Sequence, residues 1–404
     1  MTRRVVSFTW GRGLGHVSRL IAVHTELQAQ GWDSLLLTER HQRLIDDHGF
    51  RQTVIPTDAD SLVGEPLHGT GPAVDHRLAQ ALVAQALRPD DAVLHDVTVQ
   101  RELYEHATRL GCPQFLVHRF QRNRPDPAAW VARHTPAIGR VYLLGAPERQ
   151  AVEHGVSLVG VDDVVRRLLG TRSPWPPDTS AMKVAVVAGG GGHADAAGFL
   201  DAALHGVRAY ARRAAVEAVD VLVLTGPHFD GHVLVPPGLP GPVRVAPYLG
   251  PEYDVYRHAT VAITHAGYNT VRELVRSGVP AVAVPGVRDF DDQRVHLRAA
   301  AARLNATVAE ADARSVADGL AAVLGAGTGT GTDAHAVVPS ASGSASGSAS
   351  ASGSRGAPAG DGASAIARDL LAAVTARGGT PGGGCGDSRE PRGRTLSARR
   401  RCPR

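Results

Sequence analysis

The sequence predicts an α/β protein with two domains, each built on a doubly wound parallel sheet. Three observations predict this fold. Short apolar runs typical of buried strands alternate with segments of helical period from the N-terminus onward. Three prolines at residues 170–179 interrupt the alternation, which starts again at Lys183. In both halves a glycine-rich stretch directly follows the first strand. We therefore expect a first domain at 1–169, a linker at 170–180 and a second domain at 181–325.

The elements of the first domain follow from its periodicity. Apolar runs place strands at 5–9, 34–37, 53–56, 92–95, 114–118, 141–144 and 157–161. Helical period places helices at 17–30, 41–48, 75–87 and 99–110, with a Gly- and Pro-containing loop at 57–72. Helices between successive parallel strands require right-handed crossovers, which supports a doubly wound sheet.

The second domain repeats this order. Strands are expected at 184–188, 221–224, 243–246, 261–264 and 281–284. Helices are expected at 196–215, 252–258, 270–277, 291–304 and 313–324.

The composition changes after residue 325. Residues 326–363 are rich in Gly, Ala, Ser and Thr and contain the repeat SASGSASGSASASGS, so they predict a flexible low-complexity linker. Residues 364–377 regain helical period. The stretch 378–404 predicts a disordered basic tail: its last 16 residues hold seven arginines and one glutamate, a net charge of +6. Because the whole chain carries +4, the other 388 residues sum to about −2. The folded part is nearly neutral, so we expect no specific nucleic-acid partner.

Composition also bounds the location of the chain. No apolar run reaches membrane-spanning length. The N-terminus is interpreted as a first strand and not as a signal peptide. Three cysteines cannot form a disulfide framework, which fits a reducing cytoplasm. We expect a cytoplasmic protein, with peripheral contact to the inner face of the membrane left open.

The most informative block is residues 264–293, THAGYNTVRELVRSGVPAVAVPGVRDFDDQ. A buried strand leads to His265 and Gly267, and a helix follows at once. A helix that begins after a glycine offers free N–H groups and a positive dipole end to a phosphate. One turn further, Glu273 can accept two hydrogen bonds from a ribose diol. The block therefore predicts a nucleotide-diphosphate site at the carboxyl ends of the strands.

This block resembles the donor-binding signature of inverting glycosyltransferases with two Rossmann-like domains facing a cleft, the GT-B architecture. The resemblance is to the family containing the lipid-II-forming UDP-N-acetylglucosamine transferase and, more distantly, to UDP-glycosyltransferases. Their shared pattern is His-x-Gly-x-x-Thr-x-x-Glu, then Gly-x-Pro, then an acidic residue with Gln. Eight positions match it, namely His265, Gly267, Thr270, Glu273, Gly278, Pro280, Asp292 and Gln293.

The resemblance implies roles for particular residues. We expect the nucleotide sugar to contact Gly13, Gly15, Gly190, Gly191, Tyr248, Leu249, His265, Gly267, Asn269, Thr270, Glu273, Asp292 and Gln293. Asp292 and Gln293 match residues that bond the donor sugar, and the alternative is that they simply start a helix. The resemblance also suggests that the helix at 364–377 packs back onto the first domain. A free amphipathic helix is the other interpretation.

His16 ends the loop GRGLGH, between the first strand and the first helix. A helix N-terminus disfavours the imidazolium, so the base-competent neutral form is favoured. The resemblance implies a histidine base here, oriented by an aspartate at the end of a later strand, and Asp96 is at the matching place. We therefore predict His16 as general base and Asp96 as its orienting partner. The alternatives are that His16 only binds substrate and that Asp96 caps the next helix.

No cofactor is expected, because the nucleotide sugar is a substrate. The stretch GGGGH at 189–193 does not fit Gly-x-Gly-x-x-Gly, which argues against an NAD enzyme. No Asp-x-Asp pair or zinc-ligand spacing occurs in a suitable context, so we expect no metal.

The sequence therefore predicts an inverting, metal-independent glycosyltransferase that moves a sugar from a UDP-sugar, or a TDP-sugar, to a hydroxyl acceptor. The acceptor, lipid-linked or a small molecule, cannot be identified from the sequence. Two alternatives stay open. One is a nucleotide-sugar hydrolase of the same fold, in which His16 would activate water. The other is a non-catalytic nucleotide-sugar-binding protein.

Overall fold

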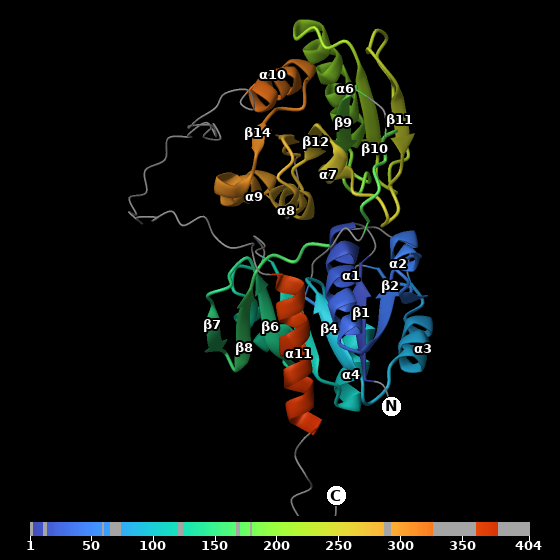
Figure 1. Cartoon of the computed structure of the whole chain (residues 1–404). Helices are drawn as coiled ribbons and strands as arrows, with labels where there is room; N and C mark the ends of the chain where they lie inside the picture. The colour runs from blue at the N-terminus through green and yellow to red at the C-terminus, as the bar shows by residue number, and fades with distance from the viewer. Residues whose placement is uncertain are drawn as a thin grey trace, which may run out of the picture.

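The computed structural model describes residues 3–10, 14–58, 60–64, 74–119, 124–166, 170–177, 180–286, 292–325 and 361–378. Figure 1 shows two α/β domains, one above the other. The predicted site residue Gly13, the expected low-complexity linker up to residue 360 and the expected tail from residue 379 lie outside the described residues.

The first domain is built on one sheet with the strand order β3-β2-β1-β4-β5-β6-β8-β7. Its strands are β1 (Arg4–Thr9), β2 (Asp33–Thr38), β3 (Arg51–Val54), β4 (Ala92–Asp96), β5 (Gln114–His118), β6 (Ile138–Leu144), β7 (Gln150–Glu153) and β8 (Val156–Val161). Neighbouring strands pair in parallel, except that β7 runs antiparallel to β8. The predicted parallel sheet has one additional edge strand, β7, which a hairpin supplies in the antiparallel direction.

Helices cover both faces of this sheet. They are α1 (Leu14–Ala29), α2 (Arg43–Asp47), α3 (His76–Ala86), α4 (Arg101–Leu110), α5 (Pro127–His134) and, from the C-terminal region, α11 (Gly362–Gly378). One core joins α1 and α11 to the sheet, and a second joins α3 and α4 to its other face. This is the doubly wound arrangement that the alternating pattern predicted.

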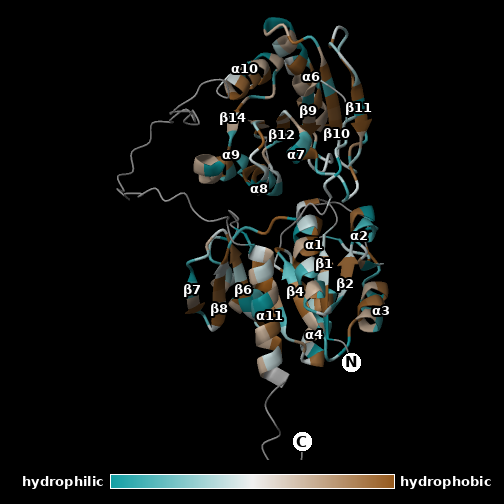
Figure 2. Ribbon diagram, viewed as in Figure 1, coloured by the Kyte–Doolittle hydropathy of each residue, from teal (hydrophilic) through white to brown (hydrophobic). Residues whose placement is uncertain are grey.

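The second domain has a parallel sheet with the order β11-β10-β9-β12-β13-β14. Its strands are β9 (Met182–Val187), β10 (Val219–Leu224), β11 (Val243–Ala246), β12 (Val261–His265), β13 (Ala281–Val284) and β14 (Ala306–Val308). Its helices are α6 (Ala196–Arg213), α7 (Val255–His258), α8 (Tyr268–Ser277), α9 (Gln293–Ala300) and α10 (Ala313–Gly325), with the 3-10 turn η1 (Ala301–Arg303). In Figure 2 the strands at the centre of the second sheet are mostly hydrophobic, as expected for strands buried on both faces.

The helix α11 packs against the first domain. Although it follows the second domain in sequence, it lies beside α1 (Figure 1). Ile366, Ala367 and Leu370 are fully buried in the same core as α1. Asp369 accepts hydrogen bonds from Tyr142 Oη at 3.0 Å and from Arg140 Nη1 at 2.6 Å. Of the two interpretations of this segment, the structure has the packed helix.

The proline-rich stretch between the domains is anchored to the second domain. Trp175 is 3% exposed, and its Nε1 donates to the Asp220 carbonyl at 3.0 Å. Arg172 pairs in parallel with Tyr253. The described part of the expected linker therefore follows the surface of the second domain.

Candidate active site

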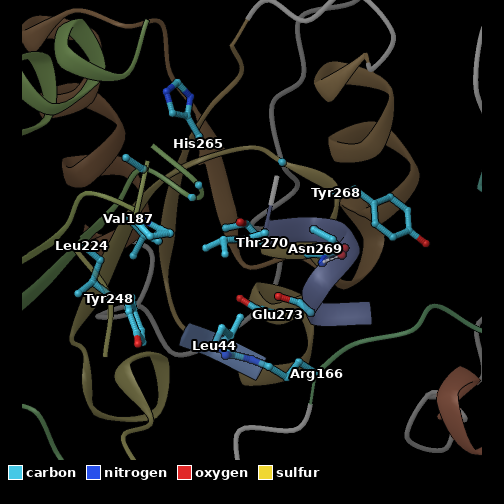
Figure 3. A pocket seen from close by; sticks show the side chains of 18 of the residues that line it. Leu44, Arg166, Val187, Leu224, Tyr248, His265, Tyr268, Asn269, Thr270 and Glu273 are labelled. Carbon is cyan, nitrogen blue, oxygen red and sulfur yellow. Dashed lines mark hydrogen bonds between the residues drawn. The ribbon is translucent and has the colours of Figure 1, made fainter. Parts of the chain in front are cut away.

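A cavity of about 620 Å³ lies between the two domains, at the carboxyl ends of both sheets. The first domain contributes Gly15, His16 and Leu44, and the second contributes residues that follow β9, β11 and β12. In Figure 3, Thr270 and Glu273 of α8 lie across the cavity from Val187, Leu224 and Tyr248. The position matches the crevice that open α/β sheets use for ligands.

His16 and Asp96 form a hydrogen-bonded pair at the floor of the cavity. His16, in the first turn of α1, lines the cavity with a side chain that is 20% exposed. Its Nδ1 lies 2.8 Å from Asp96 Oδ2, and the Asp96 side chain is fully buried behind it. This arrangement leaves the Nε2 side of the ring for a ligand. The two residues predicted to act together are thus in contact, although they are 80 positions apart in the sequence.

The backbone turns sharply directly after Asp96, at the end of β4. Val97 has a φ of 63°, a conformation that a β-branched residue rarely adopts. Arg124, which is 2% exposed, fixes this turn by donating from Nη1 to the Val97 carbonyl at 2.5 Å. The N-cap of α4 is Gln100, so Asp96 does not cap the following helix. The carboxylate at the end of β4 meets α1 through His16 and Arg19.

Arg19 is a site residue that sequence reasoning missed. It lies one turn after His16 on α1 and is only 3% exposed. Its Nε and Nη2 donate to Asp96 Oδ1 and Oδ2, both at 3.0 Å. The spacing i, i+3 from His16, which puts both side chains on one helix face, was the signal that could have found it.

The charges of these groups explain their protonation. Burial opposes ionisation of Asp96, but Arg19 and His16 outweigh it and lower the pKa of the carboxyl to about 2. Burial lowers the pKa of His16, with Arg19 and Arg119 acting in the same direction and Asp96 opposing them. The pair is therefore an ionised carboxylate and a neutral imidazole at pH 7, which is the state a general base requires.

The second domain presents the N-terminus of α8 to the cavity. Gly267 is the N-cap and provides no side-chain cap for the first-turn N–H groups. Gly267, Asn269 and Thr270 all line the cavity. Glu273 follows one turn later. Burial raises the pKa of Glu273, Asp254 adds to the effect, and Arg166 and Arg276 oppose it. The uncapped end of the helix therefore favours binding of an anion. The buried carboxyl of Glu273 favours a hydroxyl group as its hydrogen-bond partner.

Several other residues predicted to contact the nucleotide sugar also lie at this cavity. Gly15, Gly190, Tyr248, Leu249 and Gln293 line the cavity. Tyr248 also crosses the domain boundary, because its hydroxyl donates to Asp47 Oδ2 at 2.6 Å. His265 lines the cavity but is 4% exposed, and its ring stacks on Phe199 at 4.1 Å. Its side chain therefore also packs the end of β12.

Two predicted residues have structural roles in this arrangement. Gly191 has a φ of 76°, and a Cβ there would lie 2.2 Å from the Thr225 carbonyl oxygen. Asp292 caps α9 by accepting from the backbone N–H groups of Arg294 and Val295. Neither lines the cavity in the part of the chain that the structure describes. The side chain of Gln293, which lines the cavity, accepts a hydrogen bond from the Gly286 N–H at 2.8 Å. This bond anchors the backbone that follows β13.

The cavity is electropositive. Arg19, Arg43, Arg119 and Arg166 line it, and among the described lining residues Glu273 is the acidic one. The described residues hold no group of three or more His, Cys, Asp or Glu side chains that could bind a metal ion. In the same part of the chain no helix has the length and apolarity needed to cross a bilayer.

Comparison with known proteins identifies the class of this site. Residues 194–330 match the family described as the glycosyltransferase family 28 C-terminal domain. A UDP-N-acetylglucosamine–N-acetylmuramyl-(pentapeptide) pyrophosphoryl-undecaprenol N-acetylglucosamine transferase from Frankia casuarinae is 28% identical over 310 residues, covering 72% of this chain and 78% of the relative. The chain is a glycosyltransferase.

Solved structures give the fold of this glycosyltransferase. The spinosyn forosaminyltransferase SpnP superimposes with a TM-score of 0.53 at 16% identity, covering 80% of this chain and 90% of that one. The glycosyltransferase SnogD from Streptomyces nogalater gives 0.50 at 17% identity, covering 80% and 91%. The predicted GT-B architecture is confirmed, as is the predicted enzyme class. The family match covers the domain that presents α8 to the cavity, where the sequence pattern was strongest.

Proposed function

We propose that this glycosyltransferase is inverting and metal-independent and transfers a sugar from a UDP-sugar to an acceptor hydroxyl. The observation that carries the proposal is the His16–Asp96 pair, which lies beside the uncapped N-terminus of α8 in one cavity. A base and an anion-binding helix end in the same cavity are the two groups that displacement of a diphosphate at an anomeric carbon needs.

The donor would lie along α8. Its diphosphate would accept hydrogen bonds from the first-turn N–H groups and the Thr270 hydroxyl, and Glu273 would accept from the ribose hydroxyls. A ribose diol satisfies both Glu273 oxygens, whereas a 2′-deoxyribose offers one hydroxyl. This favours UDP over TDP. The name of the Frankia relative, which uses UDP-N-acetylglucosamine, supports the same donor class.

In the reaction one proton would move to the base, one bond would form at the anomeric carbon and one would break there. The Nε2 of His16 would take the proton of the acceptor hydroxyl as its oxygen attacks the anomeric carbon. The bond from that carbon to the diphosphate oxygen would break on the opposite face, which inverts the configuration. Asp96 would hold Nδ1–H and stabilise the imidazolium that forms. The α8 dipole and the cavity arginines would stabilise the charge on the leaving diphosphate without a metal ion.

The acceptor is proposed as a lipid-linked hydroxyl. The name of the Frankia relative supports this class, because that protein acts on a pyrophosphoryl-undecaprenol intermediate. A lipid acceptor would place the enzyme at the cytoplasmic face of the membrane as a peripheral protein.

The test is turnover with and without His16. We expect His16→Gln to bind UDP within about threefold of the wild-type affinity, measured by calorimetry. Release of UDP from UDP-N-acetylglucosamine, in the presence of a lipid extract as acceptor source, should fall by about 10²–10⁴-fold. The matched control is His41→Gln, because His41 is 64% exposed on the same domain.

The possible results separate the candidate functions. Slow release that the extract accelerates supports the transferase. Fast release without any acceptor would contradict it and favour the hydrolase. Binding of UDP without release in either condition would favour the non-catalytic binding protein, and an unaffected His16→Gln variant would overturn the assignment of the base.

A further inference from the structure

The two domains are joined by side chains next to the His16–Asp96 pair. Asn269, in the first turn of α8, donates from Nδ2 to the Gly15 carbonyl of α1 at 2.9 Å. The same side chain accepts from Arg19 Nη1 at 3.3 Å. One amide thus uses both of its ends on the first domain, and both partners are within four residues of His16.

Arg19 connects this contact to the pair itself. Its Nε and Nη2 hold both oxygens of Asp96, and Nη2 lies 3.3 Å from His16 Nδ1. The guanidinium also lies over the Tyr268 ring, 5.9 Å from its centroid. A planar guanidinium fixed along two edges has one orientation, so displacement of Asn269 would loosen the group that orients Asp96.

We propose that Asn269, Arg19 and Gly15 form an interdomain clasp that positions the His16–Asp96 pair only when the domains are closed. The residue that closes the clasp sits in the same helix turn that would receive the donor diphosphate. Donor binding would then set the geometry of the base before the acceptor reacts, which limits transfer to water. The role of His16 as base rests on the proposed function, whereas the clasp rests on the contacts above. Arg19 and Asn269 are positioning residues.

The pKa of His16 reports on whether the clasp is formed. The charged groups that face His16 are Asp96 from β4, Arg19 from α1 and Arg119 after β5. Arg19 lowers the pKa of His16, and Asp96 raises it. If Arg19 moves away from His16, the carboxylate of Asp96 is less neutralised and the imidazolium is favoured. The titration midpoint of His16 should therefore move to higher pH when the clasp is broken.

The experiment compares Asn269→Ala with Asn305→Ala. Asn305 lies on the same domain and is exposed, so it provides the same chemical change away from the cavity. The imidazole signal of His16, assigned by its loss in His16→Gln, is titrated by NMR in the free protein and with saturating UDP. We expect Asn269→Ala to raise the midpoint by about 0.5–1 pH unit in at least one of these states. Asn305→Ala should leave it unchanged, and thermal melts confirm that both variants are folded.

A double variant distinguishes the clasp from donor binding. If both residues act through one contact, Arg19→Lys combined with Asn269→Ala should shift the midpoint no further than the larger single change.

A wild-type midpoint in Asn269→Ala with weakened UDP binding would overturn the clasp and make Asn269 a donor ligand only. Additive shifts would overturn it as well. Failure of the wild-type protein to bind UDP would contradict the proposed function, while the titration of the free protein would still test the clasp.

Discussion

At the scale of single residues, β4 carries a buried arginine–aspartate pair at each end. Asp96 at its carboxyl end is held by Arg19, and Asp91, just before its first residue, is held by Arg4 at 2.6 Å. All four side chains are at most 6% exposed. The two pairs are alike in burial and chemistry, but only the Asp96 pair touches His16. Substituting each aspartate in turn therefore separates the loss of stability that follows removal of a buried carboxylate from the effect on catalysis.

We predict that Asp96→Asn lowers both stability and activity. Removal of the carboxylate leaves the Arg19 guanidinium buried without a counter-charge, at a cost of about 3–5 kcal/mol in the free energy of unfolding. The tautomer of His16 is no longer fixed, so kcat should fall by about 10²–10⁴-fold. Urea unfolding and UDP release from a UDP-sugar measure the two effects.

Asp91→Asn is the control for this prediction. It should lose a similar amount of stability, because Arg4 then lacks its partner, and keep kcat close to the wild-type value. Equal losses of activity in the two variants would show that Asp96 acts only through stability. The prediction is also wrong if Asp96→Asn keeps the wild-type kcat.

The site residues that could be predicted from the sequence were those in local patterns. His16, Glu273 and Gly267 follow apolar runs at spacings that identify strand ends, and Asp96 follows a predicted strand. Arg19 and Asn269 could not be assigned their roles in the same way, because their partners lie on other elements. An arginine on a helix is usually solvated. The i, i+3 spacing puts Arg19 on the same helix face as His16, but the carboxylate that Arg19 meets is 77 residues away.

At the scale of elements, α1 carries a buried histidine where it crosses the sheet. His24 is fully buried and lies 2.8 Å from both Ser7 Oγ of β1 and Ser34 Oγ of β2. Burial lowers the pKa of His24 to about 3. In the unfolded chain a histidine has a pKa of about 6.5. Between these values the unfolded state binds a proton that the folded state does not, so stability falls as the pH drops below 6.5.

We predict that His24→Gln reduces this loss. At pH 5 the mismatch for His24 alone costs about 2 kcal/mol relative to neutral pH. The variant should be less stable than the wild type at pH 7.5, because one serine loses its partner. It should also lose about 2 kcal/mol less on acidification to pH 5. Urea unfolding at both pH values measures the difference. A variant with the same loss as the wild type would show that other groups control the acid response.

The elements missed by the sequence analysis have weak or mixed patterns. The helix α5 starts at Pro127 after the N-cap Asp126, in a stretch where the sequence analysis predicted no element. The strand β14 has three residues, too few for a period. The strand β7 pairs with β8 through a turn in which His154 and Gly155 both have positive φ. The His-Gly pair could have predicted this turn, since positive φ at two successive residues is typical of two-residue hairpins.

At the scale of the whole molecule, the chain begins and ends its described part in the same domain. The helix α11 buries Ala363, Ile366, Ala367 and Leu370 against α1 and the sheet. It adds polar contacts, such as Ser364 Oγ to Glu26 Oε2 at 2.7 Å. The first domain therefore has an incomplete core until the C-terminal segment is present. Its stability depends on residues that follow the entire second domain in the sequence.

We predict that Leu370→Ala destabilises the first domain by about 2–5 kcal/mol, as expected for a leucine removed from a closed core. The first domain should unfold at a lower temperature in calorimetry, whereas UDP should still protect the second domain against heat, because Leu370 packs in the core of the first domain and α8 belongs to the second. The matched control is Leu78→Ala, since Leu78 is 47% exposed on α3 of the same domain. Its effect should be within about 0.5 kcal/mol of zero. If Leu370→Ala behaves like Leu78→Ala, α11 is not part of the first-domain core in solution. If it instead removes UDP protection with no change in the first-domain transition, the helix acts on the cavity and not on the core.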